Sequence, residues 1–390
     1  MGILWDQAKN NFEQLGTTAT HTDLAAIADD YPLLLTHATH FNTLPDWLID
    51  TADHLALAGF WHAFNIDPDS ITGTTPSAHF AHGIRGLWTH RQGKTEEAVS
   101  QFSAALCSPL PDKARDFLRL RRADSKRLTG GMGIALESFR ALAEEDGPYA
   151  NQARLWTADA ENLNGQFTHA SAIIPSPDEN SAYAGEIWIS TGFDEQANAL
   201  FPQSLTSYKK AAHYAHQTRS SALETDINGY IGEALAWTAP SEGITHSRET
   251  TEKARRHGLK LVEQRSLVAL AVASAGIEPD SHVEQAILNA ETLAHDIQDP
   301  IGTLHATVAR AWHAAIQHNT EKLATTTTRI EQLAQATGTL NHWAVIARAW
   351  LPGHTREHTE LVKRRQWLDS AEDTMRRRHQ LLEDRRALAG

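Results

Sequence analysis

Three residues typical of a phosphate-binding loop, Gly93, Lys94 and Thr95, lie in the stretch RQGKTEEA at residues 91 to 98. A complete loop also has a glycine five positions before the Gly-Lys pair, so that backbone N–H groups can surround the phosphates. That position is Trp88, and the apolar residues before it recur at helical spacing rather than as a strand. The stretch therefore predicts a turn between two helices, with Gly93 needed for its backbone, and no nucleotide site.

Histidine, which can bind metals or act in catalysis, is abundant, with 22 copies. Four pairs have a spacing that places both rings on one face of a helix, as a metal site requires: His37 with His40, His79 with His82, His213 with His216, and His354 with His358. No pair carries the glutamate of an HExxH motif, and no third ligand can be assigned. A metal-binding protein or a histidine-dependent enzyme stays open as the alternative function, and we assign no metal or other cofactor.

Common catalytic and nucleotide-binding motifs are also missing from the sequence, which contains no GxSxG elbow, no kinase signature and no GxGxxG opening a helix after a strand. The single cysteine, Cys107, is expected to be buried at the end of a helix. It excludes an internal disulfide and a cysteine zinc cluster, and it fits a cytoplasmic protein. We therefore expect a protein that is not an enzyme.

Charge restricts the partners further. The chain has 390 residues with 35 basic and 48 acidic side chains, a formal net charge of −13, which opposes non-specific binding to nucleic acid. One segment differs, because residues 113 to 127, KARDFLRLRRADSKR, hold seven basic and two acidic side chains. This segment is either a contact for an acidic partner or nucleic acid, or a solvated face paired with acidic residues nearby. The sequence has no apolar stretch of 18 residues, so we expect no membrane span.

A repeated pattern gives these residues a framework. Its first copy has a small residue, a turn glycine, a stripe of apolar residues and closing prolines: Gly86, Gly93, Ala98, Phe102, Ala105, Pro109 and Pro111. The same order recurs in Ala123, Gly130, Ala135, Phe139, Leu142 and Pro148, and more weakly in Ala158, Gly165, Ala170, Ile174 and Pro175. A fourth copy, with Gly185, Gly192, Ala197 and Phe201, follows at a shorter spacing.

These residues resemble the tetratricopeptide repeat (TPR), most clearly over residues 78 to 150. A second, similar series follows over 206 to 350, where Ala215, Ala254, Ala294 and Ala334 are 39, 40 and 40 residues apart. The resemblance implies an all-α fold, a right-handed α-solenoid of helical hairpins. We expect an N-terminal helical capping region (1–75, with helices near 3–15, 22–40 and 45–64), a first array (76–202), a second array (203–352) and a charged C-terminal helix (353–390).

In TPR proteins the first helix of each unit lines a concave groove, so the resemblance also implies groove residues. Those projected from the first unit are Phe80, Leu87, His90 and Arg91. The second unit contributes Phe117, Leu120, Asp124 and Arg127, with Arg122 added from the basic segment, and the third contributes Gln152, Leu155, Asp159 and Asn162. The Lys and Asn set by which some relatives clamp a terminal carboxylate is not matched here. The resemblance thus implies a non-catalytic scaffold or regulatory adaptor that binds a protein or peptide.

The C-terminal segment changes character after His354, with no Gly or Pro before Gly390. Leu361, Leu368, Met375 and Leu382 lie seven residues apart and form one seam of a long helix. This seam favours a helix that caps the last repeat, and the alternative is a docking or self-association helix.

Overall fold

The computed structural model describes residues 47–71, 75–145, 147–176, 183–338, 341–351, 373, 375–378 and 380. Over these residues the fold is all-α and contains no strand. The short N-terminal elements are α4 (Trp47–Leu57) and the 3-10 helices η1 (Trp61–Phe64) and η2 (Pro68–Ser70). The predicted helices near 3–15 and 22–40, and most of the C-terminal helix, lie outside the described residues. No described helix is both long and apolar enough to cross a membrane.

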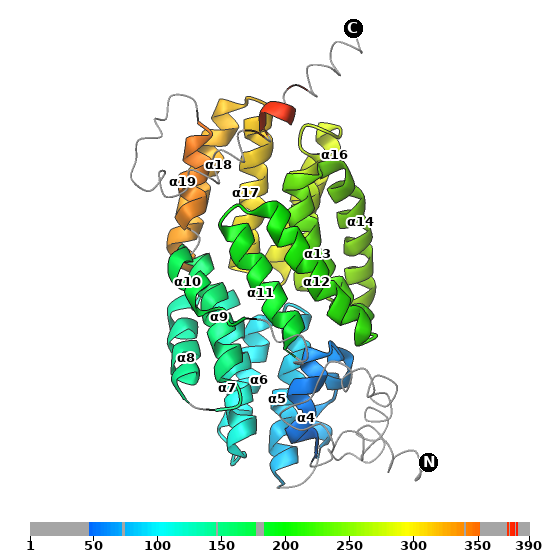
Figure 1. The fold of residues 1–390 in the computed structure, drawn as a ribbon, viewed down its shortest axis with the longest axis vertical. Helices are drawn as coiled ribbons and strands as arrows, with labels where there is room; N and C mark the ends of the chain where they lie inside the picture. The colour runs from blue at the N-terminus through cyan, green and yellow to red at the C-terminus, as the bar shows by residue number, and fades with distance from the viewer. Residues whose placement is uncertain are drawn as a thin grey trace.

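Fifteen further helices follow in antiparallel succession. They are α5 (Pro76–Arg91), α6 (Thr95–Leu106), α7 (Asp112–Leu128), α8 (Met132–Glu144), α9 (Ala150–Leu163), α10 (Phe167–Ile173), α11 (Ala184–Ala197), α12 (Phe201–Gln217), α13 (Ser221–Thr238), α14 (Pro240–His257), α15 (Lys260–Ser274), α16 (Asp280–Asp296), α17 (Pro300–Ile316), α18 (Thr320–Thr337) and α19 (Asn341–Ala349). Each helix packs on the next, and most successive odd-numbered helices also pack on one another, such as α9 on α11 and α13 on α15. This arrangement of hairpins is a TPR-like α-solenoid (Figure 1).

The hairpin turns of the first array follow the glycine pattern. Gly93, Gly130 and Gly165 have φ of 78°, 84° and 80°, the left-handed conformation that ends a helix and that glycine adopts without steric cost. The prediction of a fourth turn glycine, Gly192, is wrong. Gly192 lies inside α11, where a Cβ would come within 2.6 Å of the Tyr208 ring, and the turn is made instead by Ala199 with φ 62°. Gly192 is needed for close helix packing, a role that sequence spacing does not distinguish from a turn.

Turns at the start of the solenoid touch turns later in the chain. A Cβ added to Gly93, in the α5–α6 turn, would lie 2.9 Å from the Ile297 Cβ in the α16–α17 turn. A Cβ on Gly59 would lie 2.6 Å from the Ser220 Oγ in the α12–α13 turn. Figure 1 shows α4 to α9 in the lower half of the molecule and α14 and α16 to α19 in the upper half. These contacts narrow the inner face of the solenoid, which stays partly open to solvent.

The described part of the C-terminal segment lies against the second array. Met375 packs on the hydrophobic core, and Arg378, 1% exposed, donates to the carbonyl oxygens of Val272, Ala275 and Ala236. These carbonyls belong to the C-terminal ends of α13 and α15, which lack partners within their own helices. The segment thus closes helix ends several repeats back from its own position in the chain.

Candidate ligand-binding chamber

The inner face of the solenoid forms a partly open chamber of about 220 Å³. Every odd-numbered helix from α5 to α17 contributes to its lining, because these helices form the inner layer of the superhelix. The charged and titratable side chains around it are Arg91, Arg121, Arg127, Arg265, Asp124, Asp159, Glu186, Asp226, Glu233, Asp299, His90 and His305. The chamber therefore presents both signs of charge, drawn from segments that span more than 200 residues of sequence.

Most of the arginines in the chamber are neutralised by carboxylates. Arg91 and Arg265 both contact Asp226, at 3.0 and 3.3 Å, and Arg127 contacts Asp124 at 2.7 Å. Burial raises the pKa of Asp124, but the charge and hydrogen bond of Arg127 outweigh it and lower that pKa to about 2. The two contacts of Asp226 join three inner helices, since Asp226 lies on α13, Arg91 on α5 and Arg265 on α15. The Arg127–Asp124 pair lies within α7.

His90 joins the Arg127–Asp124 pair. Its Nε2 atom lies 3.3 Å from the Asp124 carboxylate, and Nδ1 lies 2.8 Å from the Ser125 Oγ. Burial, reinforced by the neighbouring arginines, lowers the pKa of His90 to about 4 despite the carboxylate. The ring is therefore neutral at pH 7 and acts as a hydrogen-bonding group.

Arg121 is the exception among the four arginines. Its residue is 9% exposed, and its guanidinium carbon lies 5.2 and 4.8 Å from the ring centroids of Phe117 and Trp156. It makes no hydrogen bond or ion pair within the described part of the chain, and its Nε is buried without a partner. Burial lowers the pKa of Arg121, while Glu186 and Asp124 lie near enough to act against that shift without forming an ion pair with the guanidinium.

Two carboxylates also keep a buried oxygen without a partner among the described residues. Asp159 accepts from the Ser190 hydroxyl at 3.2 Å through Oδ2, while its Oδ1 is unsatisfied, and the same holds for Oδ1 of Asp299. Burial raises the pKa of Asp159 to about 7, against the lowering effect of Arg127. A buried polar atom that lacks a hydrogen bond is costly, so each of these oxygens favours a donor that a small side-chain movement would bring within reach.

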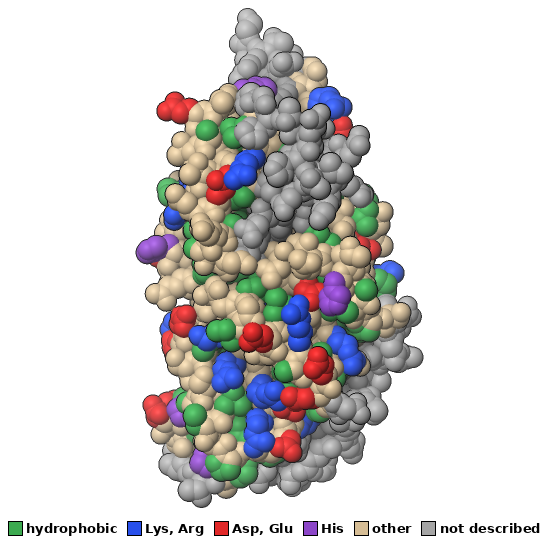
Figure 2. Space-filling view, turned by 90° about the vertical axis from the view of Figure 1, so that its left-hand side faces the viewer, with side chains coloured by type: hydrophobic (Ala, Val, Ile, Leu, Met, Phe, Trp, Pro, Cys, Tyr) green, Lys and Arg blue, Asp and Glu red, His purple; other side chains and the backbone are tan. Residues whose placement is uncertain are grey.

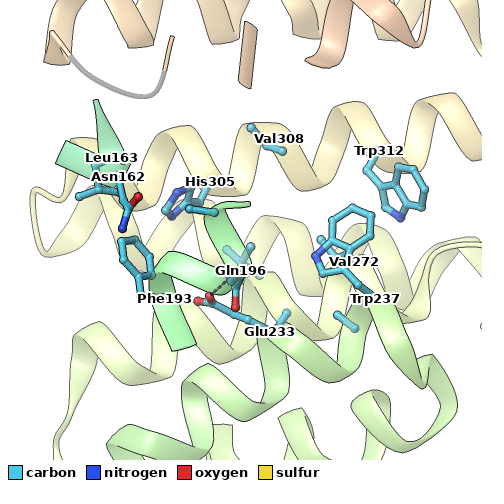
Figure 3. A pocket seen from close by; sticks show the side chains of 14 residues that line it. Asn162, Leu163, Phe193, Gln196, Glu233, Trp237, Val272, His305, Val308 and Trp312 are labelled. Carbon is cyan, nitrogen blue, oxygen red and sulfur yellow. Dashed lines mark hydrogen bonds between the residues drawn. The ribbon is translucent and has the colours of Figure 1, made fainter. Parts of the chain in front are cut away.

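A second cavity of about 110 Å³ adjoins the chamber and is mainly apolar. Leu163, Phe193, Glu233 and His305 line both. Figure 3 shows its polar end near His305 and the Gln196–Glu233 hydrogen bond of 2.9 Å, and its aromatic end at Trp237 and Trp312. These two indole rings lie 5.1 Å apart. The two cavities together form an amphipathic interior.

The groove residues expected from the sequence fall into three groups. His90, Arg91, Asp124, Arg127 and Asp159 line the chamber, and Asn162 lines the adjoining cavity. Phe80, Leu87, Phe117, Leu120 and Leu155 are at most 5% exposed and belong to the buried apolar core. Gln152 is buried and donates to Glu186 at 2.8 Å, whereas Arg122 is half-buried and lines neither cavity.

Sequence reasoning missed the contributions of the second array: Asp226, Glu233, Arg265, Asp299 and His305. Their charged side chains on alanine-rich helices were a usable signal, but the projection covered only the first three repeats. It also missed Arg121, which looked like one of several exposed cations in the basic segment. Only the packing of α7 against α9 distinguishes it.

The remaining cations of that segment are mostly paired within the chain. Arg119 contacts Asp116 and, through two nitrogens, Glu145, each at 2.9 Å, and Arg115 contacts Asp112 at 2.7 Å. Figure 2 shows one face of the molecule, on which basic and acidic side chains alternate. The charges of the segment thus form largely local pairs, which agrees with the interpretation of residues 113 to 127 as a solvated face paired with nearby acidic residues.

The other candidates for chemistry are less organised. Among the described residues no group of three His, Cys, Asp or Glu side chains could hold a metal ion. Two of the histidine pairs, at 37/40 and 354/358, lie outside those residues. Cys107 ends α6 as predicted but is exposed, so its expected burial was wrong. The residue points away from the stripe of Ala98, Phe102 and Ala105 that packs in the core.

Comparison with known proteins found similar solved structures. No family model and no curated protein match the sequence. One similar solved structure is a signal transduction ATPase with numerous domains and a tetratricopeptide repeat sensor from Pyrococcus horikoshii (14% identity, TM-score 0.42, 87% of this chain); the chain spans 55% of its length. Another is a Rap protein complexed with competence and sporulation factor (9% identity, TM-score 0.38, 97% of this chain and 98% of that one). The hairpin succession in the structure itself makes the chain a TPR-like helical-repeat protein.

Proposed function

We propose that this chain is a non-catalytic regulatory helical-repeat protein that recognises a peptide or protein partner through its interior chamber. The observation that carries the proposal is the convergence of seven inner helices on one chamber lined by charges of both signs. Residues so distant in sequence meet there only because the solenoid closes. An arrangement of this kind suits recognition, because many fixed groups contact one ligand and none needs to react.

The size of the chamber limits what it receives. At about 220 Å³, with a side cavity of about 110 Å³, it reaches only the lower end of small-molecule sites, which start near 300 Å³. A folded domain or a long helix does not fit inside. The chamber would therefore take a short segment or end of a partner, and the rest of the partner would lie on the rim.

The test uses two charge pairs on the same helix, one inside and one outside. Arg127→Gln with Asp124→Asn removes an ion pair from the chamber, and Arg115→Gln with Asp112→Asn removes an exposed ion pair on the outer side of α7. Both variants are checked for helicity and thermal unfolding, then used for affinity capture from native lysate. We expect the inner variant alone to lose a partner that the unmodified protein retains. Equal capture by all three proteins would overturn the proposal.

A further inference from the structure

One cation in the chamber has no counter-charge in contact with it. Arg91, Arg127 and Arg265 each contact a carboxylate, whereas Arg121 lies between Phe117 and Trp156 without an ion pair or hydrogen bond in the described part of the chain. Burying an unpaired charge is among the most costly events in folding. A planar guanidinium held by two aromatic rings is well suited to bind a carboxylate with two parallel hydrogen bonds.

The same chamber leaves acceptors open. Asp159 and Asp299 each have a buried Oδ1 without a partner among the described residues, and both residues line the chamber with Arg121. A ligand that carried only an anion would satisfy Arg121 and leave these oxygens without donors. A ligand with both a carboxylate and an ammonium group would satisfy both kinds of position.

The adjoining cavity supplies a third requirement. It is mainly apolar, opens on the chamber through shared lining residues, and ends at Trp237 and Trp312. An aliphatic or aromatic side chain would bury its surface there, at about 25 cal/mol per Å² of apolar area. The volume admits one or two residues and no more.

From these three features we infer that the chamber binds a small zwitterion with an apolar side chain, either a free amino acid or a dipeptide. Its carboxylate binds Arg121, its ammonium group is received by Asp159 or Asp299, and its side chain enters the tryptophan-lined cavity. This inference rests on the proposed function in one respect, because it names the chemistry recognised by the same chamber. The ligand is non-covalent, and no bond forms or breaks.

Five probes test the three contacts separately, by isothermal titration calorimetry and thermal unfolding of the full chain. L-leucine, L-phenylalanine and the dipeptide Leu-Leu carry all three groups. Leucinamide lacks the carboxylate and N-acetyl-leucine lacks the ammonium group. We expect at least one of the first three to bind at millimolar concentration or below, and the corresponding amide or acetylated form to bind at least about tenfold more weakly. Binding of leucine but not Leu-Leu, or the reverse, identifies which zwitterion the chamber accepts.

Two variants on α7 locate the binding. Arg121→Met removes the buried cation with little change of volume. It should fold, because Glu186 keeps the hydrogen bond from Gln152 and Asp124 keeps its ion pair with Arg127. Arg122→Met changes the neighbouring arginine, which lines neither cavity. Loss of binding in Arg121→Met with full binding in Arg122→Met supports the inference. It is overturned if none of the probes binds the unmodified protein, if the amide binds as well as the acid, or if Arg121→Met binds normally.

Failure of this inference can be told apart from failure of the proposed function. Partner capture that depends on the Arg127–Asp124 pair, with no zwitterion bound, would refute only the ligand chemistry. Zwitterion binding without any partner that depends on the chamber would refute the regulatory recognition and leave the ligand assignment in place.

Discussion

Replacing Arg378 by methionine should loosen the C-terminal ends of two distant helices. Arg378 donates to Ala275 O at 2.7 Å and to Ala236 O at 2.9 Å, and it also contacts Val272 O. These carbonyl groups have no partner inside α13 or α15, so the substitution leaves three buried acceptors unsatisfied. Each such loss costs about 1–3 kcal/mol.

The gain from these bonds is partly offset in the native protein. Burial, with a smaller effect of Arg377, lowers the pKa of Arg378 to about 9, so the guanidinium pays a desolvation cost to reach its site. Subtracting that cost leaves a net loss of about 2 kcal/mol for Arg378→Met. Because repeats open locally, we expect this loss in the ends of α13 and α15 rather than in the whole chain.

Hydrogen exchange measured by mass spectrometry tests the expectation. A loss of about 2 kcal/mol accelerates exchange at these helix ends by roughly 30-fold. The control is Arg376→Met, two residues away, whose guanidinium is exposed and contacts only Asp373 at 2.9 Å among the described residues. It should change exchange by less than about threefold, since exposed pairs contribute little. Equal exchange in the two variants would show that Arg378 does not hold these helix ends, and would leave the C-terminal segment as a docking element instead.

Three further predictions concern the turns, the chamber and the outer face. Gly93→Ala should destabilise the protein by about 2 kcal/mol, because φ is 78° and the added methyl group meets the α16–α17 turn. The control Gly133→Ala lies in open space on α8 and should be neutral or stabilising. Urea unfolding measures both free energies. The raised pKa of Asp159, about 7 in the fold, makes the native protein lose stability as pH rises from about 4 to 7. Asp159→Asn should therefore gain roughly 2–4 kcal/mol relative to the unmodified protein between pH 4.5 and 7.5, and a constant difference would contradict the burial argument. A double-mutant cycle on Arg119 and Glu145 should give less than about 1 kcal/mol, and a larger coupling would show that this outer pair is structural.

Local pattern predicted the repeat but not its closure. The turn glycines at 93, 130 and 165 were identified because a left-handed residue at a helix end has a strong residue preference. In the second array Gly258 and Gly338 end helices in the same conformation, but three other turns use Arg219, Gln298 and His318, with φ of 54° to 56° and no such signal. Long-range packing selects those conformations, so their residue types do not reveal them.

The division between core and chamber was equally hard to predict. Phe117 and Arg121 lie one helical turn apart on α7, yet the first belongs to the core and the second lines the chamber. A single-repeat projection assigns one face of the helix to the groove as a whole. Whether a residue on that face reaches the core or the lumen depends on the curvature of the superhelix, which is set by all the repeats together.

Closure changes how the two arrays depend on each other. In an open solenoid each repeat contacts only its neighbours, so stability is nearly a sum of local terms. Here the Gly93 turn packs on Ile297, and the Arg91–Asp226 pair links α5 to α13 across the chamber. A ligand seated between the arrays would strengthen contacts between residues more than 100 positions apart in sequence. Its binding would therefore stabilise the contacts between the turns as well as those in the chamber. Such coupling between distant sites is the physical basis of allosteric regulation.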